Sequence, residues 1–331
     1  MANILVTGGA GYIGAHACKA LAAAGHTPVA YDSLVRGHAH AVKWGPLEIG
    51  DITDGARLGE VLRTHRPEAV MHFAAFAYVG ESVARPEIYY RNNLGGALVL
   101  LDAMRQQAVG RLVFSSTCAT YGEPGQIPIG EDCPQSPINP YGASKLMVER
   151  VLADHAAAYG LAAVTLRYFN AAGADPEGEV GEDHEPEPHL IPLVLEAAAR
   201  GAAVTVHGTD YATPDGSCIR DYVHVSDIAE AHLAALRAMG QPGLRAFNLG
   251  GGEGASVLEV IETARRITRR PIAVTLGPRR PGDPAALLAD AGRAARELDW
   301  RPRFGLEDMI RTAWAWRQAR AERRREVPCA V

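Results

Sequence analysis

A glycine-rich turn near the amino terminus, set between a strand and a helix, limits the possible folds more than any other segment. Residues 3–7 favour a strand, and Gly-Gly-Ala-Gly-Tyr-Ile-Gly follows at residues 8–14. An alanine-rich run then predicts a helix that reaches Leu21 to Ala24 and ends at Gly25. Glycines at such a corner let the backbone approach a pyrophosphate at the helix N-terminus. The pattern predicts the first unit of a dinucleotide-binding fold.

The second predicted strand, residues 27–32, ends in an acidic residue. Asp32 follows Gly14 by 18 positions, close to the offset of about 20 at which a carboxylate binds the adenosine ribose of NAD. Arg36 leaves NADP open, because an arginine at this corner can bind a 2′-phosphate. Asp32 could instead be a helix cap or a solvated loop acid. We predict NAD as the cofactor.

Tyr141 and Lys145 stand four residues apart in a chain with only two other lysines, Lys19 and Lys43. Residues at this spacing share one helix face, where an ammonium beside a phenol favours the phenolate at neutral pH. A tyrosine in that setting is a usable base. The alternative is a coincidence on an ordinary amphipathic helix. We interpret the pair as catalytic because the dinucleotide turn lies in the same predicted domain.

Strand-like and helix-like runs alternate along the first half of the chain. Strands are predicted at 69–75, 111–117 and 163–170, and helices near 89–106 and 141–159. This alternation is typical of the α/β class with a Rossmann-type, doubly wound parallel sheet.

The character of the sequence changes after Asn170, where a loop rich in glycine, proline and acidic residues begins. We therefore expect two domains. The first is an NAD-binding domain over 1–170, rejoined by part of 218–250, and the second is a smaller C-terminal substrate lobe over 171–331. Because 47% of the 331 residues are hydrophobic, the chain can bury a sizeable core.

Charge and composition exclude several function classes. The net charge is −5, and no basic stretch could track a nucleic-acid backbone. The one charge run, at 320–325, is interpreted as the solvated end of a terminal helix. No run of 18 apolar residues and no leader pattern occurs, which predicts a cytoplasmic protein without membrane contact.

Cysteines and histidines give little support for a metal site. The five cysteines are scattered without a Cys-x-x-Cys pair, so they are expected to be reduced thiols. The twelve histidines form no His-Glu-x-x-His motif or similar cluster, so we predict that the chain binds no metal.

Seven segments together resemble the extended short-chain dehydrogenase/reductase family, nearly end to end. They are Val-Thr-Gly-Gly-Ala-Gly-Tyr-Ile-Gly (6–14), Gly-Asp-Ile (50–52), His-Phe-Ala-Ala (72–75), Val-Gly-Glu-Ser-Val (79–83), Ser-Ser-Thr (115–117), Arg-Tyr-Phe-Asn (167–170) and Arg-Asp-Tyr-Val-His-Val (220–225). Each segment is weak evidence alone, whereas the set is specific. The resemblance is narrowest to members that epimerise UDP-hexoses at C4, which implies a UDP-hexose substrate.

The resemblance implies roles for three catalytic side chains. Thr117 matches the Ser/Thr that hydrogen-bonds the sugar hydroxyl, and Tyr141 matches the base. Lys145 matches the residue that lowers the pKa of the base and binds the nicotinamide ribose. Thr117 could also be a plain strand former, and Lys145 a surface lysine.

By the same resemblance, one group of residues lines the NAD site, with Asp51 on the adenine amine. The group comprises Gly8, Gly11, Tyr12, Ile13, Gly14, Asp32, Ser33, Asp51, Ile52, Phe73, Ala74, Ala75, Ala77, Asn92, Tyr141, Lys145 and Phe169. Ala77 departs from the family pattern, because some epimerases carry a lysine there that faces the cofactor.

A second group matches the family's contacts to the UDP-sugar, with Arg220 and Arg280 on the pyrophosphate, where guanidinium donors suit phosphate oxygens. The group comprises Thr117, Tyr141, Asn170, His189, Leu190, Thr205, His207, Arg220, Arg280, Asp283 and Leu287. The arginines could instead be solvated surface residues, and His189 a hydrogen-bonded structural residue. Leu287 matches a gate beside the sugar: in the family, tyrosine there goes with UDP-glucose and UDP-galactose alone, and a small residue with N-acetyl sugars as well.

The residues after Thr117 distinguish the possible reactions. Related 4,6-dehydratases carry an Asp-Glu pair there, whereas this chain has Cys118 and Ala119, which cannot remove water from a ketosugar. We therefore expect reversible oxidation at C4 that interconverts UDP-galactose and UDP-glucose, with Tyr141 as base and NAD regenerated in each cycle. The alternatives are another NAD-dependent nucleotide-sugar epimerase or dehydrogenase, or a non-catalytic NAD-binding sensor on the same fold. The resemblance also implies a homodimer through the helices near 89–106 and 141–159.

Overall fold

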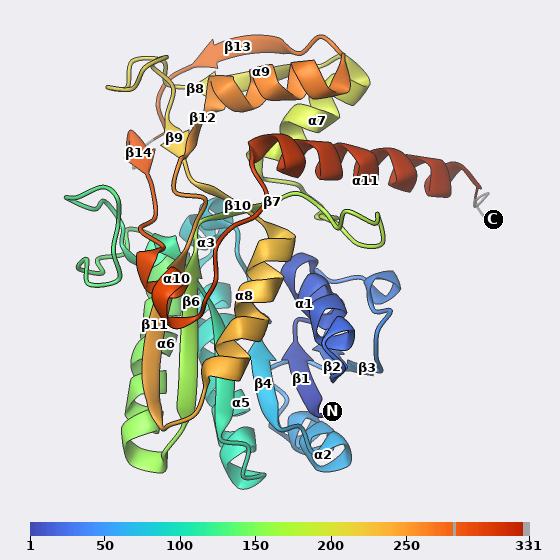
Figure 1. Ribbon diagram of the computed structural model, residues 1–331, viewed down its shortest axis with the longest axis vertical. Helices are drawn as coiled ribbons and strands as arrows, with labels where there is room; N and C mark the ends of the chain where they lie inside the picture. Colours follow the sequence, from blue (N-terminus) through green and yellow to red (C-terminus); the bar gives the residue numbers. More distant parts are fainter. Residues whose placement is uncertain (281–282, 327–331) are drawn as a thin grey trace.

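The computed structural model describes residues 1–280 and 283–326, and a seven-stranded parallel sheet lies at its centre (Figure 1). The strands are β1 (Asn3–Thr7), β2 (Thr27–Asp32), β3 (Leu47–Ile49), β4 (Ala69–His72), β5 (Arg111–Thr117), β6 (Ala162–Tyr168) and β11 (Gly243–Leu249). Their spatial order is β11-β6-β5-β4-β1-β2-β3, and every neighbouring pair is parallel. This order is that of a Rossmann sheet, so the predicted α/β doubly wound fold is confirmed.

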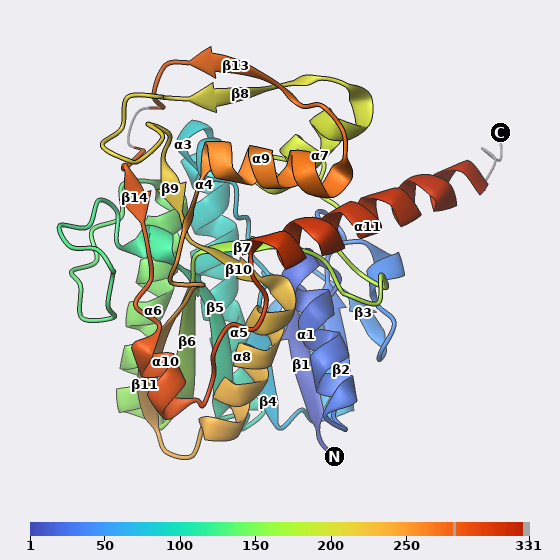
Figure 2. The same ribbon diagram turned by 45° about the horizontal axis from the view of Figure 1, so that its top comes forward.

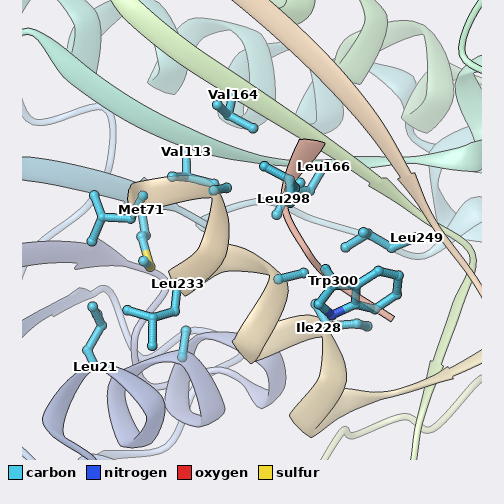
Figure 3. Packing of buried hydrophobic residues seen from close by; sticks show 14 of the residues in the cluster. Leu21, Met71, Val113, Val164, Leu166, Ile228, Leu233, Leu249, Leu298 and Trp300 are labelled. Atoms are coloured by element: carbon cyan, nitrogen blue, oxygen red, sulfur yellow. The ribbon is translucent and has the colours of Figure 1, made fainter. Parts of the chain in front are cut away.

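Helices cover both faces of this sheet. On one face lie α1 (Tyr12–Ala23) and α8 (Val225–Ala238), which pack around Leu21, Leu233 and Met71 (Figure 3). On the other lie α2 (Gly55–His65), α5 (Gly96–Gln106) and α6 (Pro140–Tyr159), whose apolar side chains form a second buried cluster with the strands.

Strand β1 shows how the sequence builds these two layers. Ile4 and Val6 belong to the core beneath α1 and α8, whereas Leu5 belongs to the core beneath α2 and α5. All three are at most 1% exposed. Successive side chains of a strand alternate between faces, and a parallel strand covered on both faces is apolar throughout. Burial of each such side chain contributes about 1.5–3 kcal/mol.

A smaller group of elements lies beyond the carboxyl ends of the strands (Figure 2). Its helices are α7 (Leu190–Arg200), α9 (Val257–Thr268) and α11 (Leu306–Glu326). Its strands are β7 (Asn170–Ala172), β8 (Ala203–His207), β9 (Ile219–Arg220), β10 (Tyr222–His224), β12 (Ala255–Ser256), β13 (Ala273–Gly277) and β14 (Ala286–Leu287). Helix α10 (Gly292–Glu297) lies instead beside β11 (Figure 2), and its Ala294 belongs to the core beneath α1 and α8. α7, α9 and α11 share a third apolar core. The domain boundary at Asn170 stays a prediction.

The element boundaries differ from the sequence predictions at three places. The helix predicted over 89–106 consists of α4 (Pro86–Tyr89), a π-helix η2 (Tyr90–Gly95) and α5. Strand β4 ends at His72, and the segment after it is held by the buried Asn93 side chain, which accepts from the Phe76 amide and donates to the Phe76 carbonyl, at 2.9 and 3.0 Å. Strand β6 ends at Tyr168, and short elements α3 (Val79–Ala84), η1 (Ala39–Ala41) and η3 (Cys118–Thr120) complete the chain.

The charged run ends α11, as predicted: Ala321 and Glu322 are exposed, whereas Arg320 is partly buried. Arg320 forms an ion pair with Asp183, in the loop before α7, and 28% of its side chain is exposed. Cys18, Cys118, Cys133 and Cys218 are free thiols, and Cys329 lies outside the described residues. Among the described helices, none is both long enough and apolar enough to cross a membrane.

Candidate active site

The residues predicted to line the NAD site lie along one edge of the sheet. Most of them stand at or after the carboxyl ends of β1, β2, β3, β4 and β6, and Tyr141 and Lys145 belong to α6. In parallel sheets, this edge is where ligands bind. Asp51 and Ile52 follow β3, and Asp51 Oδ1 accepts hydrogen bonds from the Thr53 amide and hydroxyl at 2.8 and 2.6 Å. Phe169 follows β6, and Asn92 lies in η2.

The glycine turn between β1 and α1 has no room for side chains. Gly8 has φ +74°, and a Cβ on it would lie 2.7 Å from the Ala74 nitrogen. A Cβ on Gly14 would lie 2.1 Å from the Gly8 oxygen. The N-cap of α1, Gly11, offers no capping side chain, so a ligand can approach the first turn of the helix, where Tyr12 and Ile13 lie. The turn therefore fits a dinucleotide pyrophosphate.

Asp32 is 8% exposed and bridges two backbone segments of this edge. Its carboxylate accepts hydrogen bonds from the amides of Ala10 and Leu34, at 3.0 and 2.9 Å. Burial raises the pKa of Asp32, and these two bonds oppose the shift. Asp32 is therefore neither a helix cap nor a solvated acid. Ser33, the next residue, is exposed.

Arg36, which left NADP open, is held by other side chains. Its Nη2 donates to both carboxylate oxygens of Glu81, at 2.8 and 2.9 Å. The guanidinium also lies 4.6 Å from the ring centroid of Tyr78. An arginine engaged in this way is withdrawn from a 2′-phosphate, in agreement with NAD as the cofactor.

Thr117 and Tyr141 come from different elements that meet at this edge. Thr117 is the last residue of β5, is 7% exposed, and its Oγ1 accepts from the Ala119 amide at 3.1 Å. Tyr141 lies in the first turn of α6, which begins after Asn139 caps the Gly142 amide at 2.8 Å and Pro140 occupies the first position. Desolvation raises the pKa of Tyr141 to about 12, although a hydrogen bond with Thr117 lowers it.

Lys145 is 2% exposed and points toward β5. Its Nζ donates to the Ser115 carbonyl at 2.8 Å and lies 4.9 Å from the ring centroid of Phe114. Burial lowers the pKa of Lys145 to about 7, and Glu149 opposes this shift. The surface-lysine alternative is therefore wrong. Burial of the phenol, rather than the ammonium four residues later, governs the pKa of Tyr141.

A buried ion pair lies one turn further along α6, and the sequence interpretation missed it. The Glu149 carboxylate accepts from Arg167 Nη2 at 2.6 Å, and both side chains are at most 7% exposed. Glu149 also accepts from Ser116 Oγ at 2.5 Å, while Arg167 donates to Tyr121 Oη at 2.9 Å. The pair thus joins α6 to β5 and β6, directly behind Thr117 and Lys145. Glu149 follows Lys145 by four positions, so both lie on the same face of α6, and this spacing could have indicated a buried carboxylate there.

Four residues of the predicted substrate group meet above the ends of β5 and β6. Arg220 donates to Asp283 Oδ1 at 3.0 Å and to the Pro284 carbonyl at 2.9 Å. Leu287 pairs with Arg220 between β14 and β9, and it packs on the apolar cluster that Cys118 also contacts. Asn170 donates to the Asp221 carbonyl at 2.8 Å. Leu287 and Cys118, the residue after Thr117, thus pack on the same apolar cluster.

The other predicted substrate residues lie elsewhere in the second group of elements. Thr205 and His207 are on β8, and the Thr205 hydroxyl lies 3.0 Å from that of Thr275 on β13. Arg280 is exposed. Leu190 begins α7.

His189, the N-cap residue of α7, contacts two carboxylates. Its Nδ1 lies 2.7 Å from Glu182 and 2.9 Å from Glu187. Burial alone would lower the pKa of His189, but these carboxylates raise it to about 10. With His184, the three residues form a group whose ligand atoms all lie within 4.8 Å of one another. The sequence pattern did not reveal this group, because only the fold of the loop brings the four residues together. The prediction that the chain binds no metal stays a prediction.

Comparisons with known proteins agree with this geometry. A family described as "NAD dependent epimerase/dehydratase family" matches residues 4–250. UDP-glucose 4-epimerase of Rhizobium meliloti (strain 1021) is 49% identical over 320 residues, covering 96% of this chain and 98% of the relative.

Two solved structures are also similar. UDP-glucose 4-epimerase from Brucella ovis, in complex with NAD, is 52% identical with a TM-score of 0.93, covering 95% of this chain and 98% of that one. The enzyme from Bifidobacterium longum, in complex with NAD⁺ and UDP, is 39% identical with a TM-score of 0.92, covering 96% and 99%.

Proposed function

Because the chain belongs to the NAD dependent epimerase/dehydratase family, we propose that it interconverts UDP-galactose and UDP-glucose by reversible oxidation at C4. The observation that carries this proposal is the meeting of Thr117 and Tyr141 at the carboxyl edge of the sheet, beside a glycine turn that fits a dinucleotide. The relative from Rhizobium meliloti, similar over nearly its whole length, bears the name of this activity.

The cofactor is NAD, which would supply the hydride acceptor and donor for C4 of the sugar. The glycine turn at Gly8 to Gly14 would hold the pyrophosphate, and Asp32 the adenosine ribose. The engagement of Arg36 by Glu81 supports the choice of NAD. The remaining residues of the proposed cofactor site follow the same strand ends. A lysine is missing at Ala77, so the charge facing the cofactor there differs from that of some epimerases.

We assign the proton transfer to Tyr141 and the orientation of the sugar hydroxyl to Thr117. Lys145 is proposed to bind the nicotinamide ribose and to favour the phenolate. Burial raises the pKa of Tyr141 to about 12, so the phenolate needs a further positive charge nearby. A positively charged nicotinamide in this buried setting would favour the phenolate more strongly than it would in water.

The absence of an acid after Thr117 supports epimerisation over elimination. Cys118 and Ala119 stand where a dehydratase needs an acid and a base, and desolvation raises the pKa of the Cys118 thiol to about 12. A neutral thiol of this kind is a poor proton donor or acceptor at pH 7. The 4-ketosugar is therefore expected to rotate within the site and to receive the hydride on the opposite face of C4.

The nucleotide is proposed to stay fixed while the sugar turns. Arg220 and Arg280 would bind the pyrophosphate, with Asn170 and Asp283 beside Arg220 and with His189, Leu190, Thr205 and His207 as further contacts. Binding of the unreacting nucleotide would then supply the energy that orients the sugar. The relative from Bifidobacterium longum was solved with UDP, which supports this substrate class.

Assembly and location are also part of the proposal. Leu98 and Met147 are large apolar side chains, 42% and 40% exposed, on α5 and α6. Their exposure supports a homodimer through these helices. We propose a cytoplasmic enzyme with an NAD-binding domain over 1–170, rejoined by part of 218–250, and a substrate lobe over 171–331.

The direct test is to incubate the purified protein with UDP-galactose and resolve the products. The proposal predicts UDP-glucose, without net accumulation of NADH absorbance. Stoichiometric NADH with an oxidised sugar would identify a dehydrogenase instead. Bound NAD with no change in the sugar would identify a non-catalytic sensor.

A further inference from the structure

The loop between β7 and α7 carries a compact group of metal-ligating side chains, which we call the loop cluster: Glu182, His184, Glu187 and His189. His184 Nδ1 lies 3.0 Å from Glu182 Oε1 and 3.7 Å from Glu187 Oε2. His189 Nδ1 lies 2.7 Å from Glu182 Oε1 and 2.9 Å from Glu187 Oε1. Four zinc ligands at about 2.05 Å from a tetrahedral ion are about 3.3 Å apart. The observed distances bracket this value.

The surroundings hold these ligands in place. The Glu182 carbonyl accepts from Trp316 Nε1 of α11 at 3.1 Å, and the His189 amide donates to Glu187 Oε1 at 2.9 Å. The His184 ring packs edge-on against Tyr12 and Tyr78, with ring centroids 6.2 and 5.7 Å apart. Figures 1 and 2 both show the loop beneath α11 and beside α1. The ligands therefore need little rearrangement to bind an ion.

Charge also favours an ion at this position. The two imidazole rings have centroids 5.4 Å apart, and both of their Nδ1 atoms converge on one oxygen of Glu182. One divalent cation at this point would balance the charge of the two carboxylates.

We propose that the loop cluster binds one divalent transition-metal ion of the zinc class through His184 Nδ1, His189 Nδ1 and the carboxylates of Glu182 and Glu187. Imidazole nitrogens with carboxylate oxygens suit Zn²⁺, Co²⁺ and similar ions, whereas Mg²⁺ and Ca²⁺ require oxygen ligands alone. Four protein ligands close a tetrahedral site, which gives the ion a structural role. It fixes the loop over Tyr12 and Tyr78.

A nearby acidic group provides an internal comparison. Asp175, Glu177 and Glu179 also converge, but the Lys19 ammonium lies between them, at 2.8, 2.5 and 2.7 Å. The ammonium already occupies the point where the three carboxylates converge, so this group should bind a metal poorly. Glu177, with 73% of its side chain exposed, is the matched control position.

The test uses the full-length protein with its NAD, stripped of metal by a chelator and titrated with Co²⁺. Visible absorption should rise to saturation at one Co²⁺ per chain with the intensity of a tetrahedral site, and Zn²⁺ should displace it. Changes beside metal ligands cost about 10- to 100-fold in affinity. Loss of a ligand in His184→Ala or Glu187→Gln should therefore weaken binding at least about 100-fold, whereas Glu177→Gln should bind as the parent does.

The result that overturns the proposal is an unsaturable Co²⁺ titration, or equal affinity in the parent and both ligand variants. Glu187→Gln changes few atoms, so it keeps the test decisive if His184→Ala folds poorly. The proposal goes beyond the proposed function but shares His189 with the proposed substrate group. The test variants are at His184 and Glu187, outside that group, and metal binding is measured without turnover. A failed metal titration would therefore leave the proposed epimerase activity unaffected, and an inactive enzyme would leave the metal proposal unaffected.

Discussion

The two sides of the candidate active site are built differently. On one side, Thr117, Tyr141 and Lys145 stand on a seven-residue strand and a 20-residue helix, joined by the buried Glu149–Arg167 pair. On the other, Arg220 and Leu287 stand on two-residue strands, and Arg220 is held by one carboxylate and by backbone carbonyls. We call these the catalytic side and the substrate side.

The difference indicates a division of labour. Groups that transfer protons and hydride need fixed geometry, which long elements and buried networks provide. Groups that choose among sugars can stand on short, locally supported segments. Changes on the catalytic side should therefore lower kcat or stability, whereas changes on the substrate side should alter KM or the preference among substrates.

The largest effect is expected for Tyr141→Phe. Loss of the base should lower kcat by about 10²- to 10⁴-fold, while folding and bound NAD are retained. Steady-state turnover of UDP-galactose measures this, with Tyr159→Phe, at the exposed end of the same helix, as the control. Near-parental turnover in the Phe variant would remove Tyr141 from the mechanism.

Glu149→Gln should have the next largest effect, on stability. The substitution leaves Arg167 buried without its counter-charge, and breaking a buried pair in this way costs about 3 kcal/mol or more. The free energy of unfolding, measured by urea denaturation, should fall by that amount. Glu60→Gln removes an exposed ion pair with Arg57 and should cost less than about 1 kcal/mol. An equal fall in the free energy of unfolding in both variants would show that the Glu149–Arg167 pair does not stabilise the catalytic side.

Arg220→Met tests the substrate side. Removal of a charged hydrogen-bond donor from the pyrophosphate should cost about 1.5–3 kcal/mol of binding. The loss should raise KM for UDP-galactose and leave kcat nearly unchanged. Arg266→Ala, which removes an exposed pair with Glu307, is the control and should leave both constants nearly parental. A fall in kcat with unchanged KM would show that Arg220 acts in the chemical step rather than in substrate binding.

Leu287→Ser should give the smallest effect. We predict that the parent strongly prefers UDP-galactose and has weak N-acetyl activity, because leucine fills space where an acetamido group would pass. Shrinking the side chain should shift the ratio of kcat/KM toward UDP-N-acetylgalactosamine by an amount within the about 1–3 kcal/mol that a few methylenes contribute. Leu276→Ser, at a 68% exposed leucine, should leave the ratio unchanged. Equal parental efficiency on both sugars, or an unchanged ratio in Leu287→Ser, would show that Leu287 is not the gate.

The strands of the sheet could be predicted from the sequence, because the features that define them lie within a few residues of one another. Apolar runs, the glycine turn and the Asn-Pro start of α6 each act within a few residues. The π-helix at Tyr90–Gly95 was missed, since its hydrogen bonds depend on what packs against it. Glu149 and Arg167 are 18 residues apart and meet only when α6 folds onto β6.

The loop cluster was missed for a related reason. Glu182, His184, Glu187 and His189 follow no established ligand spacing, and their segment had the composition of a linker. Its fold depends on Trp316 and Tyr12, which lie more than a hundred residues away in either direction. Pattern reading alone cannot supply such contacts.

The central claim is that one hydride leaves C4 and returns to C4 of the same sugar. It is tested most directly with UDP-galactose that carries deuterium at C4, turned over in ordinary water. The account predicts UDP-glucose that keeps the deuterium at C4, because the hydride never exchanges with solvent while the 4-ketosugar is bound. Extensive loss of the label to solvent would contradict direct hydride return.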